Sequence, residues 1–163
     1  MKGISFLSNF IKPATILIGK VYYSRSRKFN LRKKIIMTTA KNFPSDYPSH
    51  IPPKEAIELN IELFRLVSKI LPDANDFIAT YRLPSAKNRR SRLAHKPGFY
   101  GVSFFSTYDA ILRKQKEIPA FKDQIIAYGH VGPEHGKGLI GNNQHVDMWL
   151  YEGVYPTGFM KYE

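Results

Sequence analysis

Three histidines and two carboxylates fall within 18 residues in the second half of the chain. The histidines are His130, His135 and His145, and the acids are Glu134 and Asp147. Imidazole nitrogens and carboxylate oxygens are common ligands of divalent metals, so such a cluster can hold an ion that activates water. The alternative is a glycine-rich loop with solvated histidines, because Gly132, Gly136, Gly138 and Gly141 lie in the same stretch.

This stretch is similar to the core of HNH endonucleases, in which a His-hydrophobic-x-Pro strand precedes a glycine loop and an asparagine. His130-Val131-Gly132-Pro133 and Asn143 carry the similarity. The resemblance implies that His130 activates water, that Asn143 orients it, and that a later histidine such as His135 or His145 binds the metal. After Asn143, however, the pattern is that of a strand rather than a helix.

A second group of residues that could bind a ligand lies in the basic loop from Lys87 to Lys96, which has five cations in ten residues. They are Lys87, Arg89, Arg90, Arg92 and Lys96. With aromatic residues nearby in sequence, such a loop can hold RNA or DNA phosphates, or it can be a solvated loop. The composition favours a phosphate-bearing ligand without identifying it.

A third group is spread over three segments: TYRLP at 80–84, GFYGVSFFSTYDAI at 98–111 and HVDMWLYE at 145–152. Their order resembles the ADP-ribosyltransferase superfamily, in particular its small bacterial toxin-like members. Those enzymes place an Arg or His on a first core strand, an aromatic-Ser-Thr segment on a second strand, and a Glu on a late strand. The resemblance implies an α+β fold with a compact split sheet.

The resemblance further implies an enzyme that transfers ADP-ribose from its substrate NAD to an unknown target, or hydrolyses NAD. Arg82 would hold the pyrophosphate or ribose, and Glu152 would stabilise the positive charge that develops as nicotinamide leaves. Leu150 stands where the family usually has an acid or Gln. Glu152 also shares strand parity with apolar residues, so Asp147 is the alternative acid.

Other residues of the same segments would shape the NAD pocket. They are Tyr81, Gly98, Tyr100, Ser106, Thr107 and Tyr108. The family relationship implies a toxin or effector, cytoplasmic or secreted, that meets a macromolecular target and a cognate immunity or antitoxin protein. The alternative from a different class is a nucleic-acid-binding module.

The helices and strands that must position these residues are predicted from the spacing of apolar residues and from the positions of proline, glycine and turn-forming residues. Pro52-Pro53 predicts the start of a helix that runs to about Leu71. Strands are predicted at 77–83, 99–105, 124–131 and 145–152, a short helix at 108–116, and a glycine-rich loop at 132–143. A helix followed by strands with long connections indicates α+β with a mostly antiparallel or mixed sheet.

The charge of this 163-residue chain is unevenly distributed: residues 1–36 carry +9 of the net +12. We expect a basic extension over 1–44 and one α+β domain over 45–163. The extension can be a targeting segment, an arm for anionic lipid or nucleic acid, or sequence upstream of a true start at Met37. The absence of cysteine excludes disulfides and a cysteine nucleophile. The sequence contains no run of 18 apolar residues, so we expect no conventional membrane span.

Overall fold

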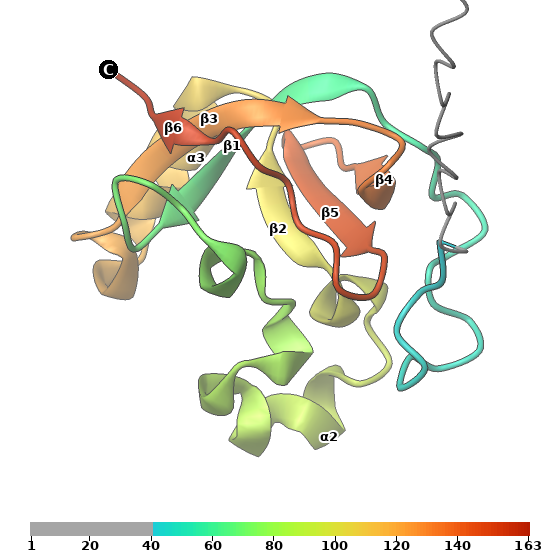
Figure 1. Cartoon of the computed structure of the whole chain (residues 1–163). Helices are drawn as coiled ribbons and strands as arrows, with labels where there is room; N and C mark the ends of the chain where they lie inside the picture. Colours follow the sequence, from blue (N-terminus) through green and yellow to red (C-terminus); the bar gives the residue numbers. More distant parts are fainter. Residues whose placement is uncertain (1–40) are drawn as a thin grey trace, which may run out of the picture. The chain divides into compact units, whose positions relative to one another are not determined.

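The computed structural model of the chain describes residues 41–163 (Figure 1). The expectations for residues 1–36, including the start at Met37, therefore concern residues outside this range. The six strands are β1 Ile61–Val67, β2 Val102–Phe105, β3 Ile125–Val131, β4 Gly136–Ile140, β5 His145–Leu150 and β6 Met160–Lys161. The α-helices in this range are α2 Arg90–Leu93 and α3 Tyr108–Glu117, and 3-10 helices occupy several connections. Every helix described is too short or too polar to cross a bilayer.

The six strands form one antiparallel sheet in the order β4-β5-β2-β1-β3-β6. The prediction of an α+β fold is thus confirmed, and of the two sheet types expected, mostly antiparallel or mixed, the structure has the antiparallel one. Pairing is uneven across the sheet: β1 is in register with β3 along all seven of its residues, but with β2 only at Phe64 opposite Phe105. Beyond that pair β1 and β2 separate, so the sheet consists of two three-stranded halves joined at a narrow contact.

Apolar side chains pack on both sides of this sheet. The larger core surrounds fully buried residues of β1, β2 and β5, which include Leu63, Phe104 and Trp149. A smaller core lies under α3, where Ala110 and Ile111 pack on residues of β1, β2 and β3. The helix prediction at 108–116 is confirmed by α3, and its buried face explains why the short helix is stable.

The predicted helix at 53–71 is wrong, because the structure has strand β1 over Ile61–Val67. The spacing of the apolar residues in 53–71 fits the apolar face of a helix almost as well as it fits an extended strand. Pairing of all seven residues with β3 decides between them, and a neighbour so distant in sequence is invisible to local periodicity.

The predicted strand at 77–83 is also wrong. Two 3-10 turns, Ala74–Phe77 and Thr80–Arg82, occupy this region instead. Asp73 and Asp76 cap the first turn reciprocally, and Phe77, Ala79 and Tyr81 are still buried at alternate positions. The segment therefore buries alternate side chains as a strand would, but it does not pair with any strand of the sheet.

The other strand predictions differ mainly in their bounds. Predictions at 124–131 and 145–152 correspond to β3 and β5. The strand predicted at 99–105 is shortened to β2, because Pro97–Tyr100 form a 3-10 turn. The expected glycine loop at 132–143 contains β4, which pairs with β5, and β6 had no counterpart in the sequence pattern.

Candidate functional sites

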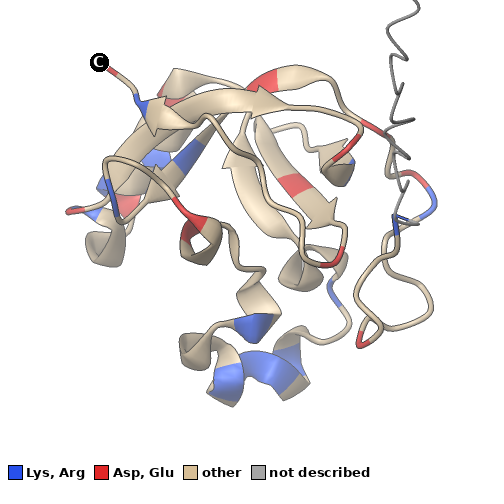
Figure 2. Cartoon of the chain, viewed as in Figure 1, with Lys and Arg blue, Asp and Glu red and all other residues tan. Residues whose placement is uncertain are grey.

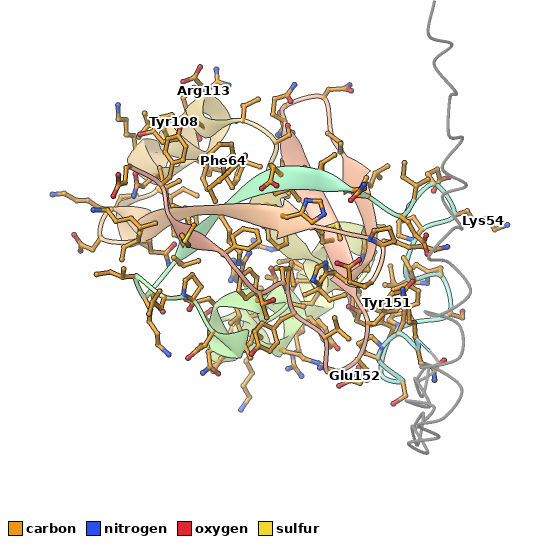
Figure 3. All side chains as sticks on the ribbon, turned by 45° about the horizontal axis from the view of Figure 1, so that its top comes forward. Lys54, Phe64, Tyr108, Arg113, Tyr151 and Glu152 are labelled. Atoms are coloured by element: carbon orange, nitrogen blue, oxygen red, sulfur yellow. The ribbon has the colours of Figure 1, made fainter. Side chains whose placement is uncertain are left out.

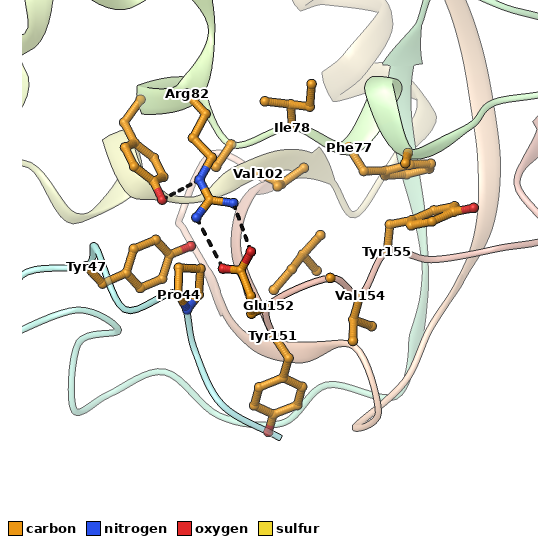
Figure 4. A pocket seen from close by; sticks show the side chains of 15 residues that line it. Pro44, Tyr47, Phe77, Ile78, Arg82, Val102, Tyr151, Glu152, Val154 and Tyr155 are labelled. Carbon is orange, nitrogen blue, oxygen red and sulfur yellow. Dashed lines mark hydrogen bonds and ion pairs between the residues drawn. The ribbon is translucent and has the colours of Figure 1, made fainter. Parts of the chain in front are cut away.

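Arg82 and Glu152, 70 residues apart in sequence, meet in the structure (Figure 4). Arg82 ends the turn Thr80–Arg82, and Glu152 follows β5. The Arg82 Nη2 lies 3.1 Å from Oε2 of Glu152 and 3.0 Å from Oδ1 of Asp46, and its Nε donates to the Tyr81 hydroxyl at 2.7 Å. The same Asp46 oxygen accepts from the Tyr81 hydroxyl at 2.8 Å. We call this group the Arg82 cluster.

The Arg82 cluster borders a cavity of about 260 Å³ with an aromatic lining (Figure 4). Tyr47, Phe77, Tyr81, Tyr151 and Tyr155 contribute rings to its wall. This volume is slightly below the range of about 300–1,000 Å³ typical of ligand pockets, so it suits part of a ligand.

The charge of Arg82 is compensated within the cluster. The hydrogen bond to Glu152 is the main reason that the pKa of Arg82 rises above its ordinary value. Desolvation opposes ionisation of Asp46, but hydrogen bonds from Tyr81 and Arg82 still lower the pKa of Asp46. One guanidinium thus faces two carboxylates, and the side chains are 41–54% exposed. An anion would find no net positive charge here.

A second arginine, Arg65 on β1, has the opposite environment. Its Nε donates to the carbonyl of Asp76, and its Nη1 donates to the carbonyl of Ser103 on β2. The guanidinium carbon lies 5.3 Å from the ring centroid of Phe104 and 5.6 Å from that of Phe77. Within residues 41–163 it forms no ion pair, and Arg65 bridges β1 and β2 where they no longer pair.

Arg65 lines a cavity of about 350 Å³, which we call the Arg65 cavity. Polar residues from five parts of the fold share its wall: Thr80, Ser103, Lys114, Gln124 and His145. The third nitrogen of Arg65, Nη2, has no hydrogen-bond partner in the described range, where every fully buried polar side-chain atom has one. Nη2 therefore faces open space. Burial lowers the pKa of Arg65 to about 10, so the guanidinium remains charged at neutral pH.

Asp147 lies on the same face of the sheet as three lining residues of this cavity, Ser103 and Phe105 of β2 and His145 of β5. It is opposite Ser103 in the β2–β5 register, while His145 is opposite Phe105. Burial raises the pKa of Asp147, against the opposing effect of His145, whose Nδ1 is 3.8 Å away. Gly98 provides the space for this carboxylate, since a Cβ there would lie 2.6 Å from its Oδ2.

The other residues expected at the NAD pocket divide between two ends of β2. Tyr81 and Tyr100 pack together with Tyr47 beside the Arg82 cluster. Ser106 and Thr107 lie beyond the opposite end of β2, where the Ser106 hydroxyl donates to Gln144. Figure 3 shows Tyr108 on the far side of the molecule from Glu152, and Tyr108 packs on Phe64.

The histidines of the expected metal site are not assembled in the structure. His130 on β3 lies 3.3 Å from Glu62, whereas His135 Nδ1 accepts from the backbone of Gly132 at 2.9 Å. β3 and β5 are separated in the sheet by β1 and β2, so His130 and His145 are far apart. Residues 41–163 contain no group of three or more side chains suited to hold a metal ion. The nuclease resemblance gains no support from this geometry.

Comparison of the chain with protein-family models, with curated proteins and with solved structures gives no match. The assignment of function therefore depends on the two cavities and the residues that line them. Sequence reasoning missed Arg65, although one signal was present. Its side chain is a cation inside the otherwise largely apolar run IELFRLV. A charge within a buried strand must be compensated by buried partners or by a ligand.

Proposed function

We propose that the chain is an ADP-ribosyltransferase-like enzyme that binds its substrate NAD in the Arg65 cavity. The observation that carries this proposal is a half-buried guanidinium that forms no ion pair within residues 41–163, whose charge the nearby Asp76 carboxylate only partly offsets, and whose Nη2 has no hydrogen-bond partner there. Such a charge is costly to bury, and an anionic ligand would compensate it. The planar donor arrangement of arginine matches the oxygens of a pyrophosphate, which NAD supplies.

The order of the elements supports the same assignment. The resemblance expects an arginine on a first core strand, and the arginine of β1 is Arg65 rather than Arg82. It expects an aromatic-Ser-Thr segment on a second strand, which Phe105-Ser106-Thr107 provides at the end of β2 before α3. It expects an acid on a late strand, and Asp147 is the acid of β5. These three strands are neighbours in the order β5-β2-β1.

In the proposed reaction the bond between nicotinamide and the ribose carbon breaks. Its electron pair moves to the ring nitrogen and neutralises the pyridinium charge. The acceptor, or water, forms a new bond to the same ribose carbon and releases a proton. His145 lines the cavity, and the Asp147 carboxylate lies behind it, against Gly98 and 3.8 Å from His145 Nδ1; from there Asp147 would oppose the positive charge that develops on the ribose. Lys114 at the cavity wall would add a cation beside the phosphates.

The test is calorimetric titration of NAD into the full chain, with ADP-ribose as a second ligand. Arg65→Lys keeps the charge but loses the planar fork, so we expect roughly tenfold weaker binding, equivalent to about 1.4 kcal/mol. Asp147→Asn should bind NAD as the wild type does and lose nicotinamide release. Arg82→Lys is the matched control, and it should change NAD affinity less than about twofold.

Two results would overturn the proposal. If folded wild-type protein binds neither ligand at millimolar concentration, the chain has no NAD site. If Arg82→Lys and Glu152→Gln abolish binding while Arg65→Lys retains it, NAD occupies the cavity beside the Arg82 cluster instead. Thermal melting of each variant separates a lost site from a lost fold.

A further inference from the structure

Beyond the Arg65 cavity, we propose that the basic segment 84–98 and the hollow beside it bind single-stranded nucleic acid. This surface does not depend on NAD or on Arg65, although the hollow shares Asp46 and Tyr81 with the Arg82 cluster. We call it the α2 surface, and it is formed by Lys87, Arg89, Arg90, Arg92 and Lys96.

The α2 surface is an isolated concentration of positive charge. Residues 84–98 contain five cations and no acid, whereas the rest of 41–163 has 11 basic and 13 acidic side chains. Figure 2 shows Lys and Arg gathered on α2 and the segments next to it, at the end of the molecule away from the sheet. All five are exposed, and within the described range none forms an ion pair with a carboxylate. The segment thus presents uncompensated charge on a body that is slightly negative without it.

The α2 surface is also anchored to the core. Ala86 is fully buried, and Leu93 packs against the larger core. The Arg90 guanidinium donates to the carbonyl of Tyr81 at 3.0 Å, which ties α2 to the preceding turn. A cationic surface fixed in this way loses little conformational freedom when it binds.

The hollow beside α2 distinguishes nucleic acid from other polyanions. It has a volume of about 480 Å³ and is lined by Arg90, Ser91 and Ala94 of the basic segment and by Tyr81, Phe99 and Tyr100, three core residues of which only a small part is exposed to a base in the hollow. Asp46 completes the wall; its Oδ1 already accepts from Tyr81 and Arg82, so Oδ2 is the oxygen that could accept from an exocyclic amine of a base. Proteins that bind single-stranded nucleic acid usually combine cations, which contact the phosphates, with aromatic rings, which contact the bases. An acidic protein surface would use the cations but not the hollow.

The experiment measures fluorescence anisotropy of a labelled single strand of about twelve nucleotides with the full chain, over a range of salt concentrations. The test variant is Lys87→Glu, Arg89→Glu and Arg92→Glu combined. The control is Lys54→Glu, Lys122→Glu and Lys161→Glu combined, which makes the same change of net charge at exposed lysines elsewhere. Residues 1–36 contribute the same nine cations to every protein compared.

We expect the test variant to bind at least tenfold more weakly than the control, with a salt dependence lower by about 2 in log–log slope. Replacement of the same three residues by Gln should give a smaller loss in the same direction, which covers the case in which charge reversal unfolds α2. An abasic strand of equal length should bind more weakly than the normal one. Equal losses in test and control variants, or equal binding of poly-glutamate, would overturn the proposal. Poly-glutamate binding would point to an acidic protein as the partner.

Discussion

Arg65 and Arg82 line two different cavities that share Ile78, and they differ in what balances their charge. Arg82 is about half exposed and faces two carboxylates, Asp46 and Glu152. Arg65 is enclosed by two aromatic rings and donates to two neutral carbonyls. The first arrangement is complete without a ligand, whereas the second leaves a positive charge that the Asp76 carboxylate only partly offsets, and a free donor at a cavity wall. An arginine whose charge is already balanced by carboxylates therefore forms a structural contact, whereas an arginine whose charge is not balanced forms a site that an anion can occupy.

The comparison also explains what each cluster does for the fold. Arg82 connects the lead-in at Asp46, the turn at Tyr81 and the segment after β5 through side-chain contacts at the surface. Arg65 connects β1 and β2 at the point where the backbones stop pairing. Solvent can replace the contacts of Arg82 but not those of Arg65, so the two should differ strongly in their contribution to stability.

The largest expected difference is in the free energy of unfolding of matched variants. Arg65→Met should lower it by about 3 kcal/mol, because the carbonyls of Asp76 and Ser103 both lose a shielded donor. Arg82→Met should lower it by less than about 1 kcal/mol, since exposed ion pairs contribute little. Urea denaturation with both variants and the wild type measures this. Equal losses would remove the distinction between the two arginines.

The same contrast shows what could be predicted from sequence. Strands β3 and β5 and helix α3 follow from alternation, capping and turn residues, which are local signals. Strand β1 was missed because it pairs with residues of β3 that are 58 to 70 positions away in the sequence. Arg82 and Glu152, which the resemblance selected as site residues, form an ion pair in the structure, and their role in binding NAD stays a prediction. The resemblance could not identify Arg65, because the segment that contains it was taken for a helix.

A second difference concerns pH, and the two sites should respond with opposite sign. Burial raises the pKa of Asp147 above 3.8, so the native state holds its proton where the unfolded state has lost it. Its carboxylate therefore costs stability as pH rises through that window. Asp46 has a lowered pKa in spite of desolvation, so its carboxylate adds stability above 3.8 that is lost as pH falls through the native pKa.

Asparagine variants should reveal this sign directly. Asp147→Asn should gain stability relative to wild type as pH rises from about 3 to 7, whereas Asp46→Asn should lose stability over the same range. Urea denaturation at several pH values measures both differences. A gain for both variants, or a loss for both, would show that the two carboxylates share one kind of environment.

The smallest expected effect is the coupling between Arg82 and Glu152 in a double-mutant cycle. Arg82→Met, Glu152→Gln and the double variant should give a coupling free energy of about 0.5 kcal/mol, because both side chains are exposed. The coupling should decrease in about 1 M NaCl, where the Debye length is about 3 Å. A coupling above about 2 kcal/mol that salt does not change would mean that water is excluded from this pair. The Arg82 cluster would then be a preorganised site in its own right, and the Arg65 cavity would lose its advantage as the place where NAD binds.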